Sequence, residues 1–507
     1  MKNANLYALF ESRFPQDKSA CAIETHDGLY YSWRDIERAT AKMANLLASL
    51  ALPPDARIAV QVEKSPEALI LYLATLQAGY VYLPLNTAYR AAEIEYFIDD
   101  AEPAVVICAP GNFGWVSKIA FQAGTRHVFT LGETRDGTLL ERANHFPDSF
   151  TTVRKLPDEM AAILYTSGTT GRSKGAMLSH GNLASNALVL HDYWQWQQGD
   201  VLLHALPLFH VHGLFVASHG ALLNGSKMIF LPRFDAATVL RHLQHTTVFM
   251  GVPTYYVRLL AEPAFNRAAC SNMRLFISGS APLLMETFNE FERRTGHTIL
   301  ERYGMSETTM QASNPYDGER IGGTVGLPLP GVTIRVVKNT PAGASVPCTI
   351  NEIGDIQVKG PNVFHGYWRM PEKTREEFTA DGYFKTGDVG KFDRKGYLSI
   401  VGRSKDLIIS GGYNVYPKEI ESFIDEIDGV VESAVIGVPH PDFGEAVTAV
   451  VVARPGAQLA EADVVALLKS KIANFKVPKR VHFIADLPRN TMGKVQKNVL
   501  REQFKDG

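Results

Sequence analysis

Short apolar runs alternate with amphipathic stretches along the chain up to about Pro330. The strand-like runs read "RIAVQV", "AVVICA", "HVFTL", "AAILYT", "VLLHALP", "KMIFLP", "VFMGVP" and "RLFISG". Each precedes or follows a segment with helical periodicity, which is the pattern of α/β layers built on parallel sheets. The sequence therefore predicts an α/β fold with layered subdomains.

The pattern changes after Pro330 to short alternating strands joined by tight turns, as in "GVTIRVVK", "GDIQVKG" and "GYLSIVGR". Such alternation predicts a small antiparallel sheet or barrel. After Gly402 a charged turn, a strand, a Gly-Gly break, a helix and another strand indicate a separate α+β unit. We therefore expect a large N-terminal domain over residues 1–402, with a small β subdomain at about 330–402, and a small C-terminal domain over 403–507.

The most apolar segment, "EALILYLATLQAGYVYLPLN" from Glu67 to Asn86, approaches the length of a membrane span. Gln77, Gly79 and Pro84 divide it into a helix, a turn and a strand, so we expect a buried βα unit and no membrane partner. The N-terminal residues "MKNANLYALF" lack a basic region followed by an apolar core, which predicts a cytoplasmic location.

Composition and charge are those of an ordinary globular enzyme. Of the 507 residues, 46% are hydrophobic and 21% are charged, which suits two to four domains. The 51 basic and 53 acidic residues nearly cancel, so a nucleic-acid partner is not expected. The four cysteines lack C-x-x-C spacing, which argues against a zinc site and a disulfide framework; they are Cys21, Cys108, Cys270 and Cys348.

The stretch "AILYTSGTTGRSKGAMLSH" at residues 162–180 places glycines, hydroxyl residues and two cations behind a buried strand. Gly168, Gly171 and Gly175 allow backbone N–H groups to converge on one anion, and Lys174 with Arg172 supplies positive charge. A polyphosphate is the expected ligand. The loop is not a Walker A motif, because Gly175 follows the lysine and Ser173 precedes it. The alternative is a flexible surface loop.

Within this stretch, "YTSGTTGRSKG" resembles the signature loop of the adenylate-forming superfamily, which includes acyl-CoA synthetases, peptide-synthetase adenylation domains and insect luciferases. Four later segments resemble the superfamily's other motifs in order and spacing: "ERYGMSET", "YFKTGDVG", "GRSKDLIISGG" and "LPRNTMGKVQK". The resemblance covers nearly the whole chain. It implies that ATP converts a carboxylic acid to an acyl-adenylate with release of pyrophosphate, that Mg²⁺ assists, and that coenzyme A then takes the acyl group.

The resemblance also implies roles for individual residues. Lys494 in "NTMGK" is the expected catalytic lysine, Glu307 a catalytic residue that helps hold Mg²⁺, Asp388 the ribose acceptor, Arg403 a ribose and phosphate contact, and Tyr303 the residue that stacks on adenine. The expected ATP-binding set is Thr166, Ser167, Gly168, Thr169, Thr170, Gly171, Lys174, Tyr303, Gly304, Thr308, Asp388 and Arg403. Taken alone, Asp388 could equally be a turn residue, and the Lys494 segment a solvated basic turn.

Lys405 stands where the superfamily hinges, and the resemblance implies that the C-terminal domain rotates between two half-reactions. Gly411 and Gly412 are expected near the channel for the pantetheine arm of coenzyme A. Lys494 would also be a target for a lysine acetyltransferase, because acetylation removes its charge.

The acid pocket is predicted from the segment "GVPTYYVRLL", expected to be a helix with Thr254 and Arg258 on one face. Arg258 could bind a distal carboxylate through its planar fork, or it could face water. Arg274 at a strand's start is a second candidate, and the strand leads to Ser280.

His210 and His212 in "LPLFHVHGLF" stand where the superfamily places a residue that borders the acyl pocket. If this segment is extended the two side chains point to opposite sides, and we favour His210 as the catalytic one. A buried structural histidine is the alternative.

Several stretches, among them "HALPLFHVHGLF" and "KGPNVFHGYWRMPEKT", resemble malonyl-CoA synthetases as a group within the superfamily, and Met310 would trim the pocket to a small diacid. Malonate is therefore the expected substrate. Methylmalonate, oxalate, a short monocarboxylate, the loading of a separate carrier protein, and a catalytically inactive nucleotide-binding protein are the alternatives.

Overall fold

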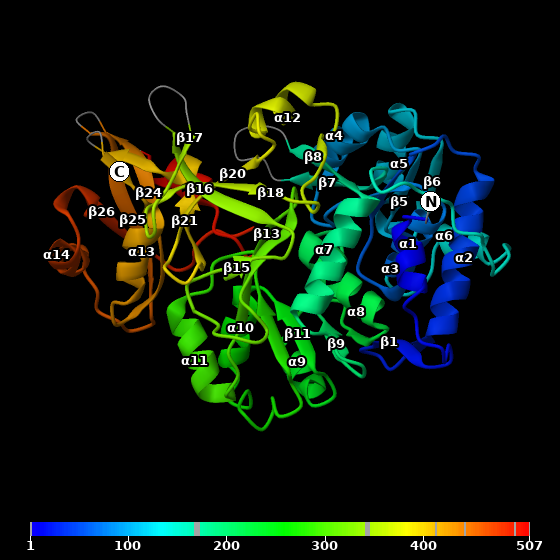
Figure 1. Cartoon of the computed structure of the whole chain (residues 1–507), viewed down its shortest axis with the longest axis horizontal. Helices are drawn as coiled ribbons and strands as arrows, with labels where there is room; N and C mark the ends of the chain where they lie inside the picture. Colours follow the sequence, from blue (N-terminus) through cyan, green and yellow to red (C-terminus); the bar gives the residue numbers. More distant parts are fainter. Residues whose placement is uncertain are drawn as a thin grey trace.

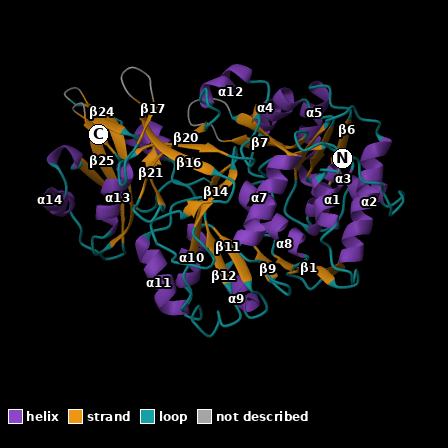
Figure 2. Cartoon of the chain, in the orientation of Figure 1, coloured by secondary structure: helices purple, strands orange, loops and turns teal. Residues whose placement is uncertain are grey.

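The computed structural model describes residues 3–166, 173–339, 345–410, 413–440, 443–490 and 493–505. Their strands form four sheets, with helices packed between and around them (Figure 1, Figure 2). Two large, mainly parallel sheets occupy the N-terminal part, and two five-stranded sheets follow along the chain. This mixed α/β architecture confirms the predicted fold class.

The first large sheet has seven strands in the order β19-β8-β7-β4-β3-β5-β6. Its central strands are parallel, whereas β7, β8 and β19 pair antiparallel. The strands are β3 (Arg57–Gln61), β4 (Val81–Pro84), β5 (Val105–Cys108), β6 (His127–Thr130), β7 (Met160–Thr166), β8 (Lys174–Ser179) and β19 (Gly366–Tyr367).

The second large sheet has nine strands in the order β15-β14-β13-β12-β11-β9-β10-β1-β2. Strands β1, β10, β9, β11, β12 and β13 run parallel, so their carboxyl ends meet along one edge. The strands are β1 (Cys21–Thr25), β2 (Tyr30–Ser32), β9 (Val201–His204), β10 (Lys227–Phe230), β11 (Val248–Gly251), β12 (Leu275–Ser278), β13 (Leu300–Met305), β14 (Thr309–Ser313) and β15 (Leu327–Pro328).

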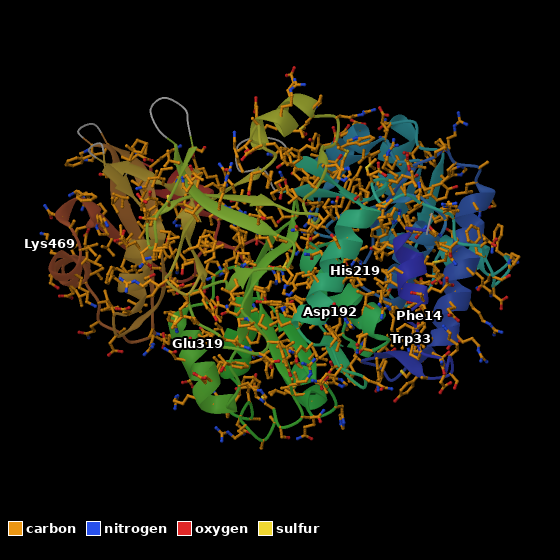
Figure 3. All side chains as sticks on the ribbon, in the orientation of Figure 1. Phe14, Trp33, Asp192, His219, Glu319 and Lys469 are labelled. Atoms are coloured by element: carbon orange, nitrogen blue, oxygen red, sulfur yellow. The ribbon has the colours of Figure 1, made fainter. Side chains whose placement is uncertain are left out.

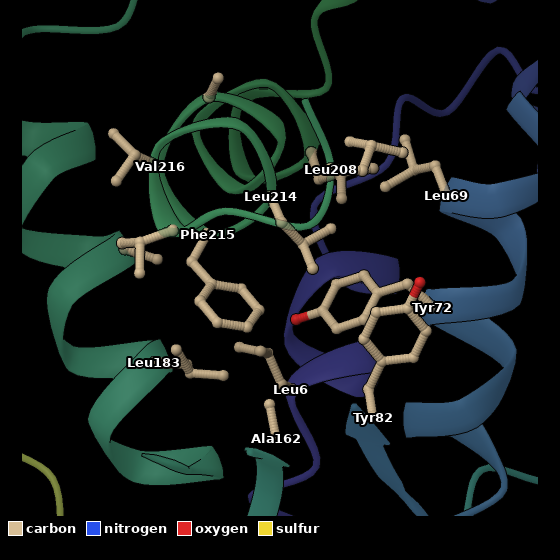
Figure 4. Packing of buried hydrophobic residues seen from close by; sticks show 14 of the residues in the cluster. Leu6, Leu69, Tyr72, Tyr82, Ala162, Leu183, Leu208, Leu214, Phe215 and Val216 are labelled. Atoms are coloured by element: carbon tan, nitrogen blue, oxygen red, sulfur yellow. The ribbon is translucent and has the colours of Figure 1, made fainter. Parts of the chain in front are cut away.

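A large apolar core joins the two sheets through the helices between them. Figure 4 shows part of it, where Leu214 and Phe215 pack near Tyr72 and Leu183. The helices of this region are α1 (Leu6–Glu11), α2 (Trp33–Ser49), α3 (Pro66–Gln77), α7 (His180–Tyr193), the π-helix η2 (His212–Ser218) and α8 (His219–Asn224). Around the sheets lie α4 (Ala91–Ala101), η1 (Pro110–Asn112), α5 (Phe113–Gln122), α6 (Thr138–Ala143), α9 (Ala236–Leu243), α10 (Pro253–Leu260), α11 (Met285–Thr295) and α12 (Pro371–Glu377).

Side chains sort by environment in the expected way (Figure 3). The rings of Phe14 and Trp33 lie 4.5 Å apart between centroids and are buried, whereas Glu319 and Lys469 are exposed.

The third sheet is antiparallel and spans residues 333–403, with strands in the order β17-β16-β18-β20-β21. They are β16 (Thr333–Asn339), β17 (Ser345–Pro347), β18 (Gly354–Lys359), β20 (Phe384–Phe392) and β21 (Leu398–Arg403). The fourth sheet comprises β22 (Ile408–Ser410), β23 (Tyr413–Val415), β24 (Val430–His440), β25 (Gly444–Ala453) and β26 (Arg480–Ile484). It is accompanied by η3 (Ser404–Asp406), α13 (Pro417–Asp425), α14 (Glu461–Lys471), η4 (Asn474–Lys476) and α15 (Lys497–Phe504).

The local predictions hold for the apolar runs. Each of the eight quoted strand-like runs contains one strand of the two large sheets, and residues 67–86 form the rest of α3, a turn and β4, nearly all of it buried. Within the described residues, no helix has the length and apolar character needed to cross a bilayer.

Candidate active site

The candidate site lies at the carboxyl edge of the nine-stranded sheet, where the third sheet and the C-terminal segment approach it. Strand β13 leads into Glu307 and Thr308, β20 carries Asp388, and β21 ends at Arg403. A crevice outside the carboxyl ends of parallel strands is the usual ligand site of an open α/β sheet.

Asp388 is the best-held carboxylate of the site and is almost fully buried. The Tyr303 hydroxyl donates a hydrogen bond to its Oδ2, and the Arg403 Nε lies 2.7 Å from its Oδ1. Strand pairing places Asp388 directly opposite Arg403, and the carboxylate raises the pKa of that guanidinium. These two contacts fix the carboxylate and leave lone pairs that can accept hydrogen bonds from ribose hydroxyls.

Glu307 is a buried carboxylate next to a lysine. Its Oε1 accepts a hydrogen bond of 2.9 Å from the Tyr367 hydroxyl, and burial raises its pKa. The Lys174 Nζ lies 4.3 Å from the Tyr367 ring centroid and 3.5 Å from Glu377, and its charge acts on Glu307.

Thr166 and Lys174 pair across the hairpin of β7 and β8, at the base of the predicted phosphate loop. The predicted ligands Ser167, Gly168, Thr169, Thr170 and Gly171 lie outside the described residues. The structure thus places the base of the loop beside Glu307, as the shared Tyr367 contact shows.

The residues near Glu307 fit Mg²⁺. No group of three or more His, Cys, Asp or Glu in the described part of the chain could form a metal cage. Mg²⁺ is typically bound through one or two carboxylates together with substrate phosphates and water, so a single carboxylate is sufficient. The neighbouring Thr308 Oγ1 is buried and has no hydrogen-bond partner among the described residues, which leaves an oxygen free for a ligand.

Lys494 reaches the same site from the C-terminal segment. Two hydrogen bonds of 2.9 Å close its turn. The Lys494 backbone N–H donates to the Asn490 Oδ1, and the Asn490 backbone N–H donates to the Lys494 carbonyl oxygen. Gly493 lies so close to α10 that a β-carbon there would be 3.3 Å from Thr254. Burial and then the charge of Arg403 lower the pKa of Lys494, while Asp388 and Glu307 oppose this. Lys494, Arg403, Asp388 and Glu307 were predicted from separate motifs, and they lie close enough for their charges to interact.

The predicted hinge lies directly behind this cluster. Lys405 is in η3, where burial lowers its pKa to about 8 and the charges of Arg403 and Lys494 add to the effect. Its neighbour Asp406 holds Arg501 of α15 at 2.7 Å. Gly411 and Gly412 lie outside the described residues.

A second cluster of residues surrounds Arg302, a residue that the sequence analysis did not single out. Its side chain is 4% exposed, and its Nε and Nη2 have no hydrogen-bond partner among the described residues. Burial lowers its pKa to about 9, so it is still protonated at neutral pH. Gly279 provides the room, because a β-carbon there would lie 2.3 Å from the Arg302 Cζ. A buried, unpaired guanidinium is costly unless a ligand pairs with it.

Two histidines and a serine belong to the same cluster of residues as Arg302. The His212 Nδ1 lies 3.3 Å from the Ser280 Oγ, and its buried Nε2 has no partner among the described residues. Burial and then the charge of Arg302 lower the pKa of His210 to about 4 and that of His212 well below its usual value, so both rings are neutral. Ser280 has φ of 74°, a strained conformation that is typical of functional sites.

The structure answers the condition placed on the two histidines and corrects one other prediction. The segment with His210 and His212 is not extended, because η2 begins at His212, and the charge of Arg302 lowers the pKa of both rings. The preference for His210 over His212 stays a prediction. The proposed role of Arg274 is wrong. It lies at the amino end of β12, where its Nη2 is 2.6 Å from the buried Asp200, so it is held at the other edge of the sheet.

The structure also shows where the other residues predicted for the acid pocket lie. Arg258 is exposed on α10, one turn beyond Thr254, and it makes no ion pair within the described residues. Met310 is buried in β14 and packs against Gly304, whose added β-carbon would lie 2.2 Å from the Met310 Cε. Their roles in acid selection stay predictions.

Sequence reasoning missed Arg302 because it stands inside the motif "ERYGMSET", between residues already given roles. The available signal was a charged residue in a strand of a buried sheet, which is rare unless the charge has a partner. Tyr367 was missed for a different reason: its contact with Glu307 joins positions far apart in the sequence.

Comparison with known proteins agrees with this geometry. Residues 10–368 match the family described as AMP-binding enzyme, and residues 419–494 match the AMP-binding enzyme C-terminal domain. A malonate–CoA ligase from Arabidopsis thaliana is 34% identical over 555 aligned positions, covering 100% of this chain and 90% of that protein.

Among solved structures, ATP-bound MatB from Rhodopseudomonas palustris is 55% identical and superposes with a TM-score of 0.97, covering 100% of this chain and 99% of that one. Apo MatB from the same organism, with the same identity and coverage, gives a TM-score of 0.86. The arrangement of this chain is thus closer to the ATP-bound form than to the apo form.

Proposed function

The chain belongs to the AMP-binding enzyme family, and we propose that it ligates malonate to coenzyme A through a malonyl-adenylate, with AMP and pyrophosphate as the other products. In the first step a malonate carboxylate oxygen attacks the α-phosphorus of ATP, and the bond to the β-phosphate breaks to release pyrophosphate. In the second step the thiol of coenzyme A attacks the carbonyl carbon and AMP leaves.

The observation that carries the choice of a diacid is the orphaned guanidinium of Arg302. A monocarboxylic acid would be consumed at the reacting end and would leave Arg302 unpaired. A second carboxylate offers the planar acceptor that an arginine fork matches. If Ser280 donates to the His212 Nδ1, the neutral ring carries its proton on Nε2 and can donate to the same acid.

The adenylation chemistry follows from the first cluster of residues. Asp388 accepts ribose hydroxyls, and Lys174, Arg403 and Lys494 supply positive charge around the phosphates, where negative charge accumulates in the transition state. Lys494 comes to this set from the C-terminal segment, on a turn closed by the bridge between Arg489 and Val495. Glu307 and Thr308 would hold Mg²⁺, which neutralises phosphate charge when bound.

Coenzyme A must approach the adenylate after Lys494 has acted. We propose that the C-terminal domain, residues 403–507, rotates about Lys405 between the two steps, and that Gly411 and Gly412 then border the pantetheine arm. One contact of this domain with the N-terminal domain is the ion pair between Arg454 and Glu286 at 2.8 Å, whose side chains are both exposed. An exposed ion pair of this kind is weak, so it does not oppose a rotation.

The test is acid-dependent exchange of labelled pyrophosphate into ATP, measured with malonate, methylmalonate, oxalate and butyrate at equal concentration. Malonate should give the highest specificity constant, with butyrate at least tenfold lower, about the effect of one charged hydrogen bond. Equal or better exchange with butyrate would overturn the diacid assignment, and only the more general assignment as an acyl-CoA ligase would stand. No exchange with any acid would overturn adenylation itself.

Two further proposals concern the cell. They are a cytoplasmic location and the modification of Lys494 by a lysine acetyltransferase, and the second follows from the role proposed for this lysine in adenylation. Fractionation of cells tests the first. Site-specific incorporation of acetyllysine at position 494 tests the second, and an acetylated enzyme with the full adenylation rate would contradict it.

A further inference from the structure

Lys64 is a lysine between the two large sheets that has no acidic partner. It follows β3 of the seven-stranded sheet, and its Nζ reaches His204 at the end of β9 in the nine-stranded sheet. The Nζ lies 2.9 Å from the His204 Nδ1 and 2.8 Å from the His204 carbonyl oxygen. It also lies 4.3 Å from the Phe230 ring centroid. No carboxylate in the described part of the chain lies within ion-pair distance of it, and burial lowers its pKa well below the usual value.

The other side of the His204 ring contacts the π-helix η2. Its ring is 1% exposed, and its Nε2 lies 3.0 Å from the Gly213 carbonyl oxygen and 3.1 Å from the Ser218 Oγ. The Gly213 carbonyl oxygen can only accept, so Nε2 must carry the proton, and the Nδ1 of the neutral ring accepts from the Lys64 amine. The neutral ring then carries its proton on Nε2 and donates it to the π-helix. Burial and the charge of Lys64 both favour the neutral ring.

The hydrogen-bond acceptor is in the first turn of η2, which begins with His212 of the proposed acid pocket. The Ser218 hydroxyl donates to the same Gly213 carbonyl at 2.9 Å, so His204 and Ser218 together fix this oxygen. A π-helical turn is wider and less regular than an α-helical one and is found mostly at functional sites. Its geometry therefore needs support from side chains, and the orientation of His212 toward Ser280 depends on that support.

We propose that Lys64 is a positioning residue for acid binding: through His204 it fixes the first turn of the π-helix and so aims His212 at the bound acid. Lys64 touches neither the acid nor ATP. It acts across the boundary between the two sheets, so it also couples the position of the acid pocket to the seven-stranded sheet that carries the phosphate loop. The inference rests on the proposed function only in requiring that the site activates an acid.

The experiment compares Lys64→Met, His204→Phe and the double variant with the full-length wild type in the pyrophosphate exchange assay, using the acid that the wild type activates best. Lys64→Met should raise the KM for the acid about tenfold, the upper end of what one ordinary hydrogen bond contributes, and leave the KM for ATP within about twofold. The double variant should be no worse than His204→Phe, because both changes break one path. Lys227→Met is the matched control, since Lys227 lies at the amino end of β10, beside β9, and pairs with Glu24.

The outcomes separate the possibilities. A wild-type KM for the acid in Lys64→Met, an equal rise in the KM for ATP, or additive effects in the double variant would each overturn the inference. If Lys64→Met does not fold, Lys64→Gln keeps a donor without the charge. It should stay near wild type under the proposal, and a tenfold loss there would assign the effect to charge and refute positioning. A wild type without acid-dependent exchange refutes the proposed function instead. A structure of Lys64→Met with the His212 to Ser280 contact of 3.3 Å intact would also refute the inference.

Discussion

Replacing Arg302 by methionine should separate stability from activity. Methionine has a similar length and no charge, so it fills the space that Gly279 leaves for the guanidinium. Without an acid, wild-type Arg302 has two buried nitrogens with no partner among the described residues. Leaving such groups unsatisfied costs about 1–3 kcal/mol. The variant should therefore unfold no more easily than the wild type, and its free energy of unfolding should rise by about 1 kcal/mol.

The same change should damage the use of malonate. Each charged hydrogen bond to the distal carboxylate contributes about 1.5–3 kcal/mol, and a tenfold change corresponds to about 1.4 kcal/mol. Loss of one such bond lowers kcat/KM for malonate by roughly ten- to a hundredfold, and loss of both by more. Butyrate ends in a methyl group, so its use should be unchanged or improved. The KM for ATP should change much less, because successive side chains of β13 point to opposite faces of the sheet, so Arg302 and Tyr303 face opposite ways.

The assay is pyrophosphate exchange with malonate and with butyrate, together with urea unfolding of the empty protein. Arg274→Leu is the matched control: it breaks the buried pair with Asp200 and should lower stability without changing the ratio of malonate to butyrate use. The reasoning would be refuted by an Arg302→Met enzyme that keeps the wild-type ratio. It would equally be refuted if stability and activity fell together, because Arg302 would then be a structural residue.

Three further changes test other parts of the site. Lys494→Ala should nearly abolish adenylation but largely spare thioester formation from supplied malonyl-adenylate; equal loss in single-turnover assays of both steps would contradict domain rotation. Arg258→Leu should raise the KM for malonate far more than that for ATP if this arginine reaches the acid, and unchanged discrimination against butyrate would show that it faces only solvent. Burial raises the pKa of Glu301 from its ordinary value of 4.5 to about 8, so the folded state keeps a proton that the unfolded state loses near pH 4.5. Stability should fall between these pH values by up to about 1.4 kcal/mol per pH unit, and Glu301→Gln should flatten that fall in urea unfolding measured from pH 5 to pH 8.

Much of the fold could be predicted because local pattern and tertiary structure agree. The run "RLFISG" became β12, and the breaks at Gln77 and Gly79 separated α3 from β4 as expected. The ribose and phosphate residues could also be placed, because each stands in a short motif with a fixed local geometry. Asp388 and Arg403 are an example: both ends of their contact lie on adjacent strands of one hairpin.

The acid pocket could not be derived in the same way because it depends on long-range packing. Whether Arg302 is paired is decided by the surroundings of Gly279 and Tyr256, which no single motif contains. Whether the segment of His210 and His212 is extended could not be decided from its sequence, because an apolar run with two histidines suits a strand or a helix, and periodicity does not separate them in a short segment. The Arg274 prediction failed because the sequence does not reveal that Asp200 is its partner.

The most direct test of the account uses malonate labelled with ¹⁸O in its carboxylate groups, incubated with ATP, Mg²⁺ and coenzyme A. If a carboxylate oxygen attacks the α-phosphorus, that oxygen stays on the phosphate when the thiol displaces it, and mass spectrometry should find one ¹⁸O in each AMP formed alongside malonyl-CoA. Label in inorganic phosphate together with unlabelled ADP would instead show attack at the γ-phosphorus, and would contradict a malonyl-adenylate.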